Sequence, residues 1–389
     1  MNIIRNENLF HPNLIKNKFN LIDCLCGTFL FIPFFLMISG TSVSLPQDYY
    51  NPTGFPLHVG MLFFFFYLSE VKIEMSKMVM LLILLLYALI WALDPTRQLL
   101  IIQSSLFIFY FIFFESIPEQ RLMNLVKYGL NAIKIFAIAH VISVIAMPGV
   151  GDVGFVGSIT EFYGFPIYQA GVTYPAILIF ALIIDKEIFS TENNISYWVF
   201  LLAVIFIELS LARRVSIGFM ALYLLFYHFR LSMIGSGFIG IGAAIYNIDI
   251  TLLYRLVDRF NEILTLNLRQ YPIIRSINML QDPAIFLYGN GRPNWAHNYP
   301  LQLATTHGVF YTLIILTIFF YYCVHKYFHE NLKFKKWSLV ILGFMTIDFM
   351  VNANLTQPIY AGVLTITIVS VKKFGLHNQS SINKHAESR

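Results

Sequence analysis

One short segment of this chain concentrates residue types that could do chemistry. It reads "GNGRPNWAHNYP" and spans residues 289–300. Gly289 and Gly291 permit a tight backbone turn and the close approach of a ligand. Asn298 stands where a helix N-cap is expected, because Pro300 suits the first turn of the helix that follows. We therefore expect a backbone turn, a ligand site and a helix start within this segment.

His297 is the candidate general base of the segment. It lies beside the expected helix N-terminus, whose partial positive charge disfavours imidazolium, and neighbouring Arg292 acts in the same direction. A neutral imidazole at the boundary between water and an apolar phase is suited to take a proton from a hydroxyl group. The alternative is that His297 only hydrogen-bonds its own loop, but the adjacent arginine, glycines and helix start favour the catalytic interpretation.

The composition predicts an all-α integral membrane protein. Hydrophobic residues make up 57% of the 389 residues and charged residues 12%. Apolar runs such as "MVMLLILLLYALIWAL" approach the length that crosses about 30 Å of hydrocarbon. About twelve transmembrane helices are predicted, at residues 19–40, 56–69, 78–93, 98–114, 122–147, 167–184, 196–211, 214–229, 231–246, 301–323, 337–352 and 354–371.

The distribution of lysine and arginine predicts the orientation of these helices. With a cytoplasmic N-terminus, most of the 26 cationic residues face the cytoplasm, whereas the outward loops 41–55 and 148–166 contain none. Both termini are then cytoplasmic. The predicted organisation is a cytoplasmic N-terminus (1–18), a polytopic membrane domain (19–371) with one large outward loop (247–300), and a cytoplasmic tail (372–389).

Every cationic side chain on the predicted outer side is arginine, although lysine is the commoner cation in the chain. The guanidinium group forks onto phosphate or carboxylate oxygens through two parallel hydrogen bonds. Arg213 and Arg214 form a turn between two spans, where they could clamp a phosphate or anchor the helix ends among lipid headgroups.

The large outward loop carries further arginines near residues 289–300. Apolar residues at helical spacing predict a helix up to Pro272, which is expected to end it, and a second helix carrying Arg275 then follows. Arg269 and Arg275 are candidate phosphate ligands because they lie close to the glycine-rich segment in sequence.

No metal or cofactor is expected. No outward cluster of His, Asp and Glu has metal-ligand spacing, and the three cysteines lie within predicted helices. The net charge of +5 follows from membrane topology and gives no reason to expect nucleic acid. Lys134, in the middle of a predicted span, is expected to face the bundle interior or to extend to the membrane boundary.

The arrangement resembles the superfamily of O-antigen polymerases and O-antigen ligases, the Wzy-type membrane glycosyltransferases. Three features between residues 196 and 323 carry the resemblance. They are the outer-edge turn "LARRVSIGF", the large outward loop with an arginine upstream of "NMLQDPAIFLYGNG", and "GNG" followed by "HN" before the next helix. The length of the chain and its single large loop favour the polymerase over the ligase. Two adjacent arginines stand where one is typical of the family.

That resemblance implies a bundle of the C-type glycosyltransferase class in the bacterial inner membrane, active at the periplasmic face without a metal. His297 matches the loop histidine proposed as the base in that family. One helix-edge arginine and one loop arginine bind the lipid diphosphate there, and here two residues could fill each place. The candidate ligands of the diphosphate or saccharide are Arg213, Arg214, Arg269, Arg275, Arg292 and Asn298.

The implied substrates are oligosaccharide repeat units linked to undecaprenyl diphosphate, and a chain-length regulator protein is a further candidate partner. Two other functions stay open. An O-antigen ligase would transfer the finished glycan to lipid A–core. A flippase or transporter for lipid-linked oligosaccharides would need charged or broken helices at the bilayer midplane. The outward arginines and the His-Asn loop favour a surface active site.

Overall fold

The computed structural model describes residues 20–31, 73–90, 94–146, 161–162, 165–166, 173–189, 194–211, 214–229, 267–292, 298–321, 336–351 and 358–387. Within these ranges the fold is all-α, apart from one antiparallel ladder between β1 (Glu161–Phe162) and β2 (Phe165–Pro166). The helices are α1 (Leu21–Phe31), α4 (Met75–Ile90), α5 (Pro95–Ser116), α6 (Glu119–Ala146), α7 (Thr173–Ile184), the π-helical turn η2 (Asp185–Phe189), α8 (Ile195–Leu211), α9 (Arg214–Tyr227), α12 (Asn267–Met279), α13 (Pro283–Tyr288), α14 (Tyr299–His307), α15 (Val309–Phe319), α16 (Lys336–Val351) and α17 (Pro358–Glu387).

Where the predicted spans fall on described residues they are largely helical, whereas the predicted spans 56–69 and 231–246 lie outside the described residues. One helix in the described part of the chain, Glu119–Ile142 within α6, is long and apolar enough to cross a membrane by length and composition. The other apolar helices found there are shorter. α17 continues through Glu387, beyond the predicted end of the last span at residue 371.

Two predictions about helix boundaries are wrong. Pro272 does not end a helix, because α12 runs through it from Asn267 to Met279. A proline inside a helix removes one i→i−4 hydrogen bond and crowds the carbonyl group of residue i−4, which strains or kinks the helix without always ending it. The predicted single span 301–323 is broken into α14 and α15 at Gly308, whose φ is 88°. A right-handed helix cannot continue through that conformation.

α1 and α6 pack in parallel around two glycines. At the start of both helices the Asp23 carboxylate accepts hydrogen bonds from Arg121 at 2.7 Å and from Asn124 at 3.0 Å. Further along, a Cβ on Gly27 would overlap the backbone of α6, and one on Gly129 would overlap the Phe31 ring and the backbone of α1. Small residues therefore let the two backbones touch, which is how helices associate closely in apolar surroundings.

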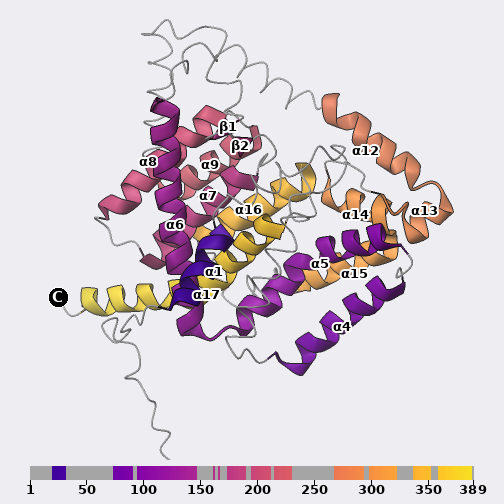
Figure 1. Ribbon diagram of the computed structural model, residues 1–389, viewed down its shortest axis with the longest axis horizontal. Coiled ribbons are helices and arrows are strands. Elements are labelled where there is room, and N and C mark those ends of the chain that lie inside the picture. Colours follow the sequence, from indigo (N-terminus) through magenta and orange to yellow (C-terminus); the bar gives the residue numbers. More distant parts are fainter. Residues whose placement is uncertain are drawn as a thin grey trace, which may run out of the picture.

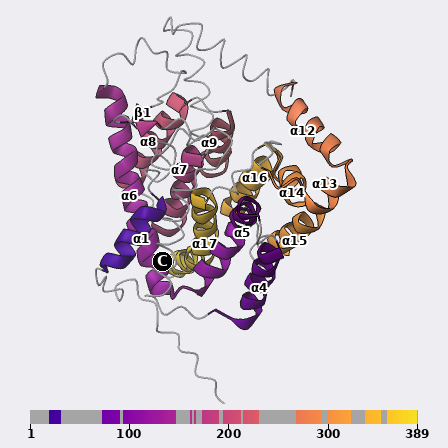
Figure 2. The same ribbon diagram turned by 45° about the vertical axis from the view of Figure 1, so that its right-hand side comes forward.

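α5 packs against α4, α15 and α17 (Figures 1 and 2). α5 and α15 are parallel. The Tyr311 hydroxyl donates to the Ile101 carbonyl oxygen at 2.9 Å near the start of both helices, and the rings of Phe107 and Phe319 meet further along at 4.8 Å. These two contacts fix the register between α5 and α15.

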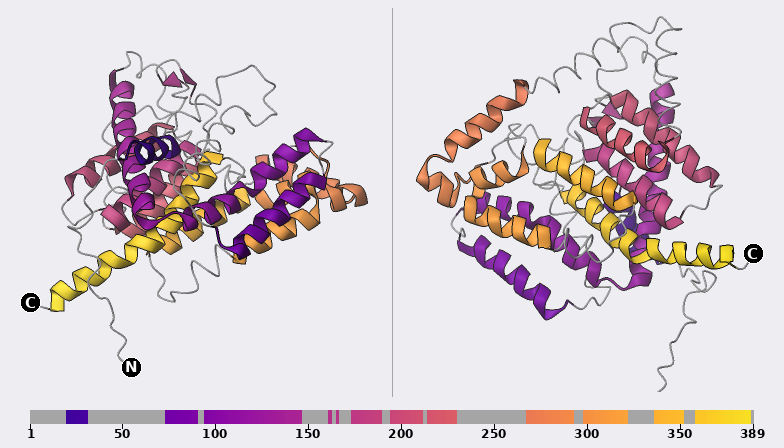
Figure 3. Two further views of the ribbon diagram at one scale, coloured as in Figure 1. Left: turned by 60° about the horizontal axis from the view of Figure 1, so that its bottom comes forward. Right: turned by 180° about the vertical axis from the view of Figure 1, so that it is seen from behind.

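Glu115, near the end of α5, connects α5 to both α4 and α17. Its carboxylate lies 3.2 Å from the ammonium of Lys77 near the start of α4, so α4 and α5 are antiparallel. The backbone oxygen of Glu115 accepts a hydrogen bond from Lys373 of α17 at 3.1 Å. The views from below and from behind show α4, α5 and α15 side by side (Figure 3).

η2 connects α7 to three other helices through consecutive charged residues. Asp185 is fully buried, and its partner Lys134 projects from the middle of α6. Lys134 therefore faces the bundle interior. The contacts of η2 join Asp185 to Lys134 of α6 at 2.7 Å, Glu187 to the Tyr227 hydroxyl of α9 at 2.6 Å, and the Lys186 ammonium to the Tyr197 ring of α8 at 5.0 Å.

We predict that the Lys134–Asp185 pair stabilises the fold only as a pair. Lys134→Met should lower the free energy of unfolding by about 3–5 kcal/mol, because it leaves the Asp185 charge buried without a partner. The double variant with Asp185→Leu should regain most of that loss. Thermal unfolding of the purified protein measures both effects, with Lys127→Met in the same helix as the control. Equal losses in the single and double variants would contradict the pairing.

Candidate functional site

α13 leads into the glycine-rich segment and begins at a sequence-encoded cap. The Asp282 carboxylate accepts the Ala284 amide at 2.8 Å, and Pro283 occupies the first helical position. The helix lasts less than two turns and ends at Gly289, whose φ is 70°. Gly291 also has a positive φ, of 68°. The chain therefore turns between α13 and Arg292.

The glycine-rich segment supplies backbone donors to the break between α14 and α15. A helix ends with carbonyl groups that lack partners within the helix. In α14, each of the last four carbonyl oxygens nevertheless accepts a hydrogen bond. The donor is either the C-cap residue or a residue outside the helix. The acceptor and donor pairs are Ala304 with the Gly308 amide (2.9 Å), Thr305 with the Asn290 amide (2.9 Å), Thr306 with the Gly291 amide (3.0 Å) and His307 with the Tyr87 hydroxyl (3.1 Å).

Two glycines make this docking possible because each touches the other segment's backbone. A Cβ on Gly289 would overlap the Thr306 carbonyl group, and a Cβ on Gly308 would overlap the Leu287 carbonyl group. The sequence suggested that the glycines admit a ligand. Among the described residues, the group that approaches Gly289 is the protein's own broken helix.

The other end of the segment is attached to the same helix. Asn298 is the N-cap of α14, and its side-chain oxygen accepts the Leu301 amide at 3.1 Å. Gly291 is bound near the C-terminal end of α14, and Arg292 follows with its amide donating to the Asn290 side chain at 2.9 Å. Asn290 and Gly291 on one side and Asn298 on the other are therefore attached to opposite ends of α14.

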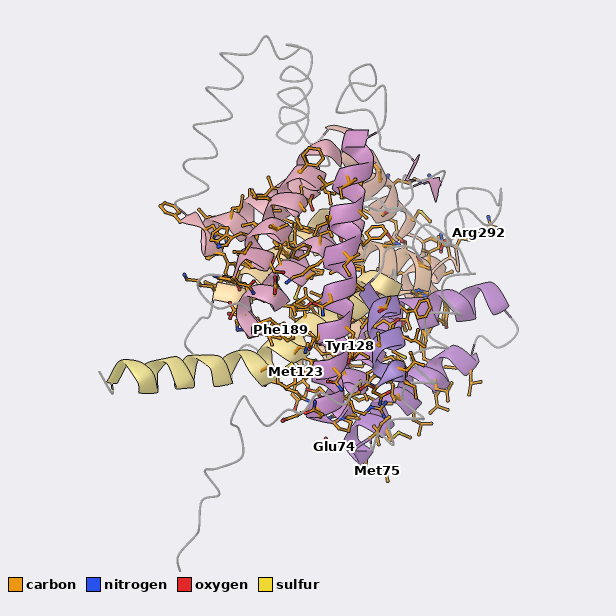
Figure 4. The ribbon with its side chains drawn as sticks, turned by 60° about the vertical axis from the view of Figure 1, so that its left-hand side comes forward. Glu74, Met75, Met123, Tyr128, Phe189 and Arg292 are labelled. Carbon is orange, nitrogen blue, oxygen red and sulfur yellow. The ribbon has the colours of Figure 1, made fainter. Side chains whose placement is uncertain are left out.

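The candidate arginines are described to different extents. Arg275 in α12 and Arg292 are exposed, and Figure 4 shows Arg292 at the edge of the molecule, far from Glu74 at the start of α4. Arg214 begins α9 and Arg269 lies in α12, but only their backbones are described. The side chains of Arg213 and His297, two central residues of the predicted site, lie outside the described residues.

α9 and the helices α12 to α14 lie on opposite sides of α16 (Figures 1 and 2). α9, which begins at Arg214, packs against α16, and α16 also packs against α14. α12, which carries Arg269 and Arg275, packs against α14. The structure thus brings Arg275 and Arg292 to the same group of helices, α12 to α14, and separates them from the start of α9 by one helix.

Sequence analysis overlooked two residues of this region. Tyr87 lies in an almost uniformly apolar run, and nothing in its spacing indicates that its hydroxyl bonds the helix break. Glu208 is 1% exposed in α8, one to two turns before the Arg213–Arg214 turn. A single acid in the run "VFLLAVIFIELSLA" is itself a signal, because an ionisable group in an apolar helix is costly and often functional.

Within the described ranges, no group of three or more His, Cys, Asp or Glu side chains could hold a metal ion. No protein-family model, no curated protein and no solved structure matches this chain.

We predict that Gly289→Ala and Gly308→Ala each destabilise the protein by more than about 1 kcal/mol, because both residues have positive φ and touch backbone atoms. The melting temperature of the purified protein should fall in both variants. Gly218→Ala is the matched control, since no atom lies within 4 Å of a Cβ at that helical position. It should be neutral or slightly stabilising, and an equal loss in all three variants would rule out the docking explanation.

We also predict that Asn298 acts as a helix cap. Asn298→Ala should cost about 1 kcal/mol in unfolding free energy, because the Leu301 amide loses its acceptor. Asn298→Asp keeps an acceptor oxygen and should retain nearly wild-type stability. Calorimetry or thermal unfolding distinguishes the two variants. If Asn298→Ala leaves the melting temperature unchanged, the cap contributes nothing.

Proposed function

We propose that this protein is an O-antigen polymerase of the inner membrane that joins oligosaccharide repeat units carried on undecaprenyl diphosphate. The observation that carries the proposal is the attachment of Asn290 and Gly291 to one end of α14 and of Asn298 to the other, while α12, which carries the exposed Arg275, packs against the same helix. A loop held at two points is suited to present a base at a fixed distance from phosphate ligands.

The directions of the packed helices support a membrane-spanning arrangement. Consecutive membrane spans run in opposite directions. Two spans that pack in parallel must therefore have an odd number of spans between them in the sequence. The parallel pairs α1–α6 and α5–α15 meet this condition with the predicted set of spans, and the antiparallel pair α4–α5 is consecutive in it. The alternating direction of the predicted spans therefore agrees with the packing.

The apolar surface of α4 supports the same arrangement. A soluble monomer rarely exposes a contiguous apolar patch of this kind. Lipid tails would cover it in a bilayer. The exposed large apolar residues of α4 are Met75, Met78, Val79, Leu82, Ile83, Leu85, Leu86, Leu89 and Ile90.

The proposed reaction uses one base and the arginines. His297 takes the proton from a hydroxyl of the incoming lipid-linked repeat unit, and that oxygen attacks the anomeric carbon of the growing chain. The bond between this carbon and the diphosphate oxygen breaks, the configuration inverts, and undecaprenyl diphosphate leaves. Arginine side chains stabilise the charge that develops on the diphosphate. The sugar–diphosphate bond is already activated, so the reaction needs no ATP.

A transporter or flippase is the alternative from a different class, and the helix break is the feature that favours it. Transporters use broken helices whose free carbonyls coordinate ions near the bilayer midplane. Here the four terminal carbonyls of α14 are all engaged by Gly308, Asn290, Gly291 and Tyr87. This favours a supporting role for the break over an ion site. An O-antigen ligase remains the nearest alternative within the same superfamily.

Deletion of the gene in its source strain tests the proposal, and the lipopolysaccharide is separated on a gel. We predict core carrying a single repeat unit, because ligation persists while polymerisation is lost. Wild-type protein should restore the ladder, whereas His297→Ala, expressed at an equal level, should not. His325→Ala is the matched histidine control and should restore the ladder.

The other gel patterns separate the alternatives. Bare core after deletion would indicate a ligase or a flippase. An unchanged ladder would exclude O-antigen assembly. A full ladder with His297→Ala would eliminate this histidine as the base.

A further inference from the structure

Several helix ends that the predicted topology places on the cytoplasmic side meet at one place in the structure. η2, at the end of α7, contacts the start of α8, where the Lys186 ammonium lies 5.0 Å from the centre of the Tyr197 ring. The Tyr197 hydroxyl forms a hydrogen bond of 2.5 Å with the ring of His228, at the end of α9. Side chains from η2, α8 and α9 are thus joined in one cluster.

The start of α16 lies at the same place. Its first residue, Lys336, is exposed, and the positive charge of Lys336 acts on the His228 ring, as does that of Lys186. α16 packs against α9, and a Cβ on Gly343 would overlap the Leu222 side chain, about two turns inside both helices. Two lysines from different segments therefore lie near one histidine. We call Lys186, His228 and Lys336 the cationic cluster.

Both lysines of the cationic cluster are available to an anion from outside the protein. The neighbouring acids are engaged, because Asp185 is fully buried against Lys134 at 2.7 Å and the Glu187 carboxylate accepts a tyrosine hydroxyl of α9. Among the described residues, no ion pair joins Lys186 or Lys336 to an acid. Lys186 is held over an aromatic ring, which orients its ammonium without neutralising it.

An exposed apolar stripe on α8 begins at the cationic cluster. Ile195, Trp198, Val199 and Leu202 are all exposed, and their spacing places them on one face of the helix. The Trp198 ring lies 5.1 Å from the His228 ring, so the stripe and the cluster adjoin. In the predicted orientation the stripe runs from the cytoplasmic boundary into the bilayer, and tryptophan is common at that boundary.

We propose that the cationic cluster and the stripe bind an anionic phospholipid of the cytoplasmic leaflet, with its phosphate at Lys186 and Lys336 and its acyl chains along α8. Basic residues at this membrane surface attract anionic lipids, and basic sites between helices hold their headgroups. A soluble phosphate would use the same lysines, but only a lipid would also cover the stripe. The inference uses the predicted membrane orientation and does not depend on the proposed reaction.

The test measures tryptophan fluorescence of the full-length protein in detergent micelles. The probe is phosphatidylglycerol with brominated acyl chains, because bromine quenches a tryptophan that it contacts. Phosphatidylcholine with the same chains is the comparison lipid. Trp198→Phe identifies the part of the quenching that arises at the stripe, and unbrominated phosphatidylglycerol and inorganic phosphate serve as competitors. The melting temperature of each variant checks that its fold persists.

We expect saturable quenching by brominated phosphatidylglycerol, with several-fold higher affinity than for phosphatidylcholine, and its loss in Trp198→Phe. Lys186→Gln and Lys336→Gln should each weaken binding about fivefold, because each removes one charge that attracts the anionic headgroup. Lys127→Gln removes a partly buried charge from α6 and is the matched control, which should bind as the wild type does. Unbrominated phosphatidylglycerol should displace the probe, whereas an equal concentration of inorganic phosphate should not.

The remaining outcomes overturn the inference. Equal affinity for both lipids would remove the role of the headgroup charge, and unchanged affinity in both lysine variants would remove the cationic cluster. Saturable quenching that persists in Trp198→Phe would place the lipid elsewhere. Displacement by inorganic phosphate would identify a soluble phosphate as the ligand. Each of these results leaves the proposed polymerisation to the gel pattern of the deletion strain.

Discussion

A helix that breaks inside an apolar bundle must find partners for its terminal carbonyl groups, and this requirement shapes the region around Gly308. No water is available in an apolar phase to replace a missing donor, and an unsatisfied backbone group there costs several kcal/mol, roughly. The donors come from the Gly-Asn-Gly turn and from Tyr87. The Gly-Asn-Gly turn and the Tyr87 hydroxyl of α4 both meet that requirement.

The remaining helices are held by contacts that do not rely on apolar burial alone. Two glycines set the distance between α1 and α6, and the Asp23 carboxylate fixes their register. A tyrosine hydroxyl sets the register of α15 on α5, and a buried ion pair joins η2 to α6. In a lipid environment apolar surfaces gain little from touching each other, so close backbone contact and satisfied polar groups carry more of the specificity.

The same segment serves the architecture and the proposed chemistry. Its glycine end completes the helix break, and its asparagine end caps α14. Exposed arginines stand on the adjoining elements, as a site for a lipid diphosphate requires. The Tyr87 hydroxyl bonds the end of α14, the helix to which this segment is attached, to α4.

The sequence by itself determined the all-α class, most helix positions, the start of α14 near Asn298 and the presence of a turn at the two glycines. Each of these depends on local periodicity, capping or backbone freedom, which neighbouring residues encode. Only the tertiary structure decided that the tenth span breaks at Gly308, that α12 continues through Pro272, and what the glycines approach. It alone paired Lys134 with Asp185 and brought Tyr87 to His307. These outcomes depend on partners far apart in the chain, and no local pattern specifies which distant group will supply a missing hydrogen bond.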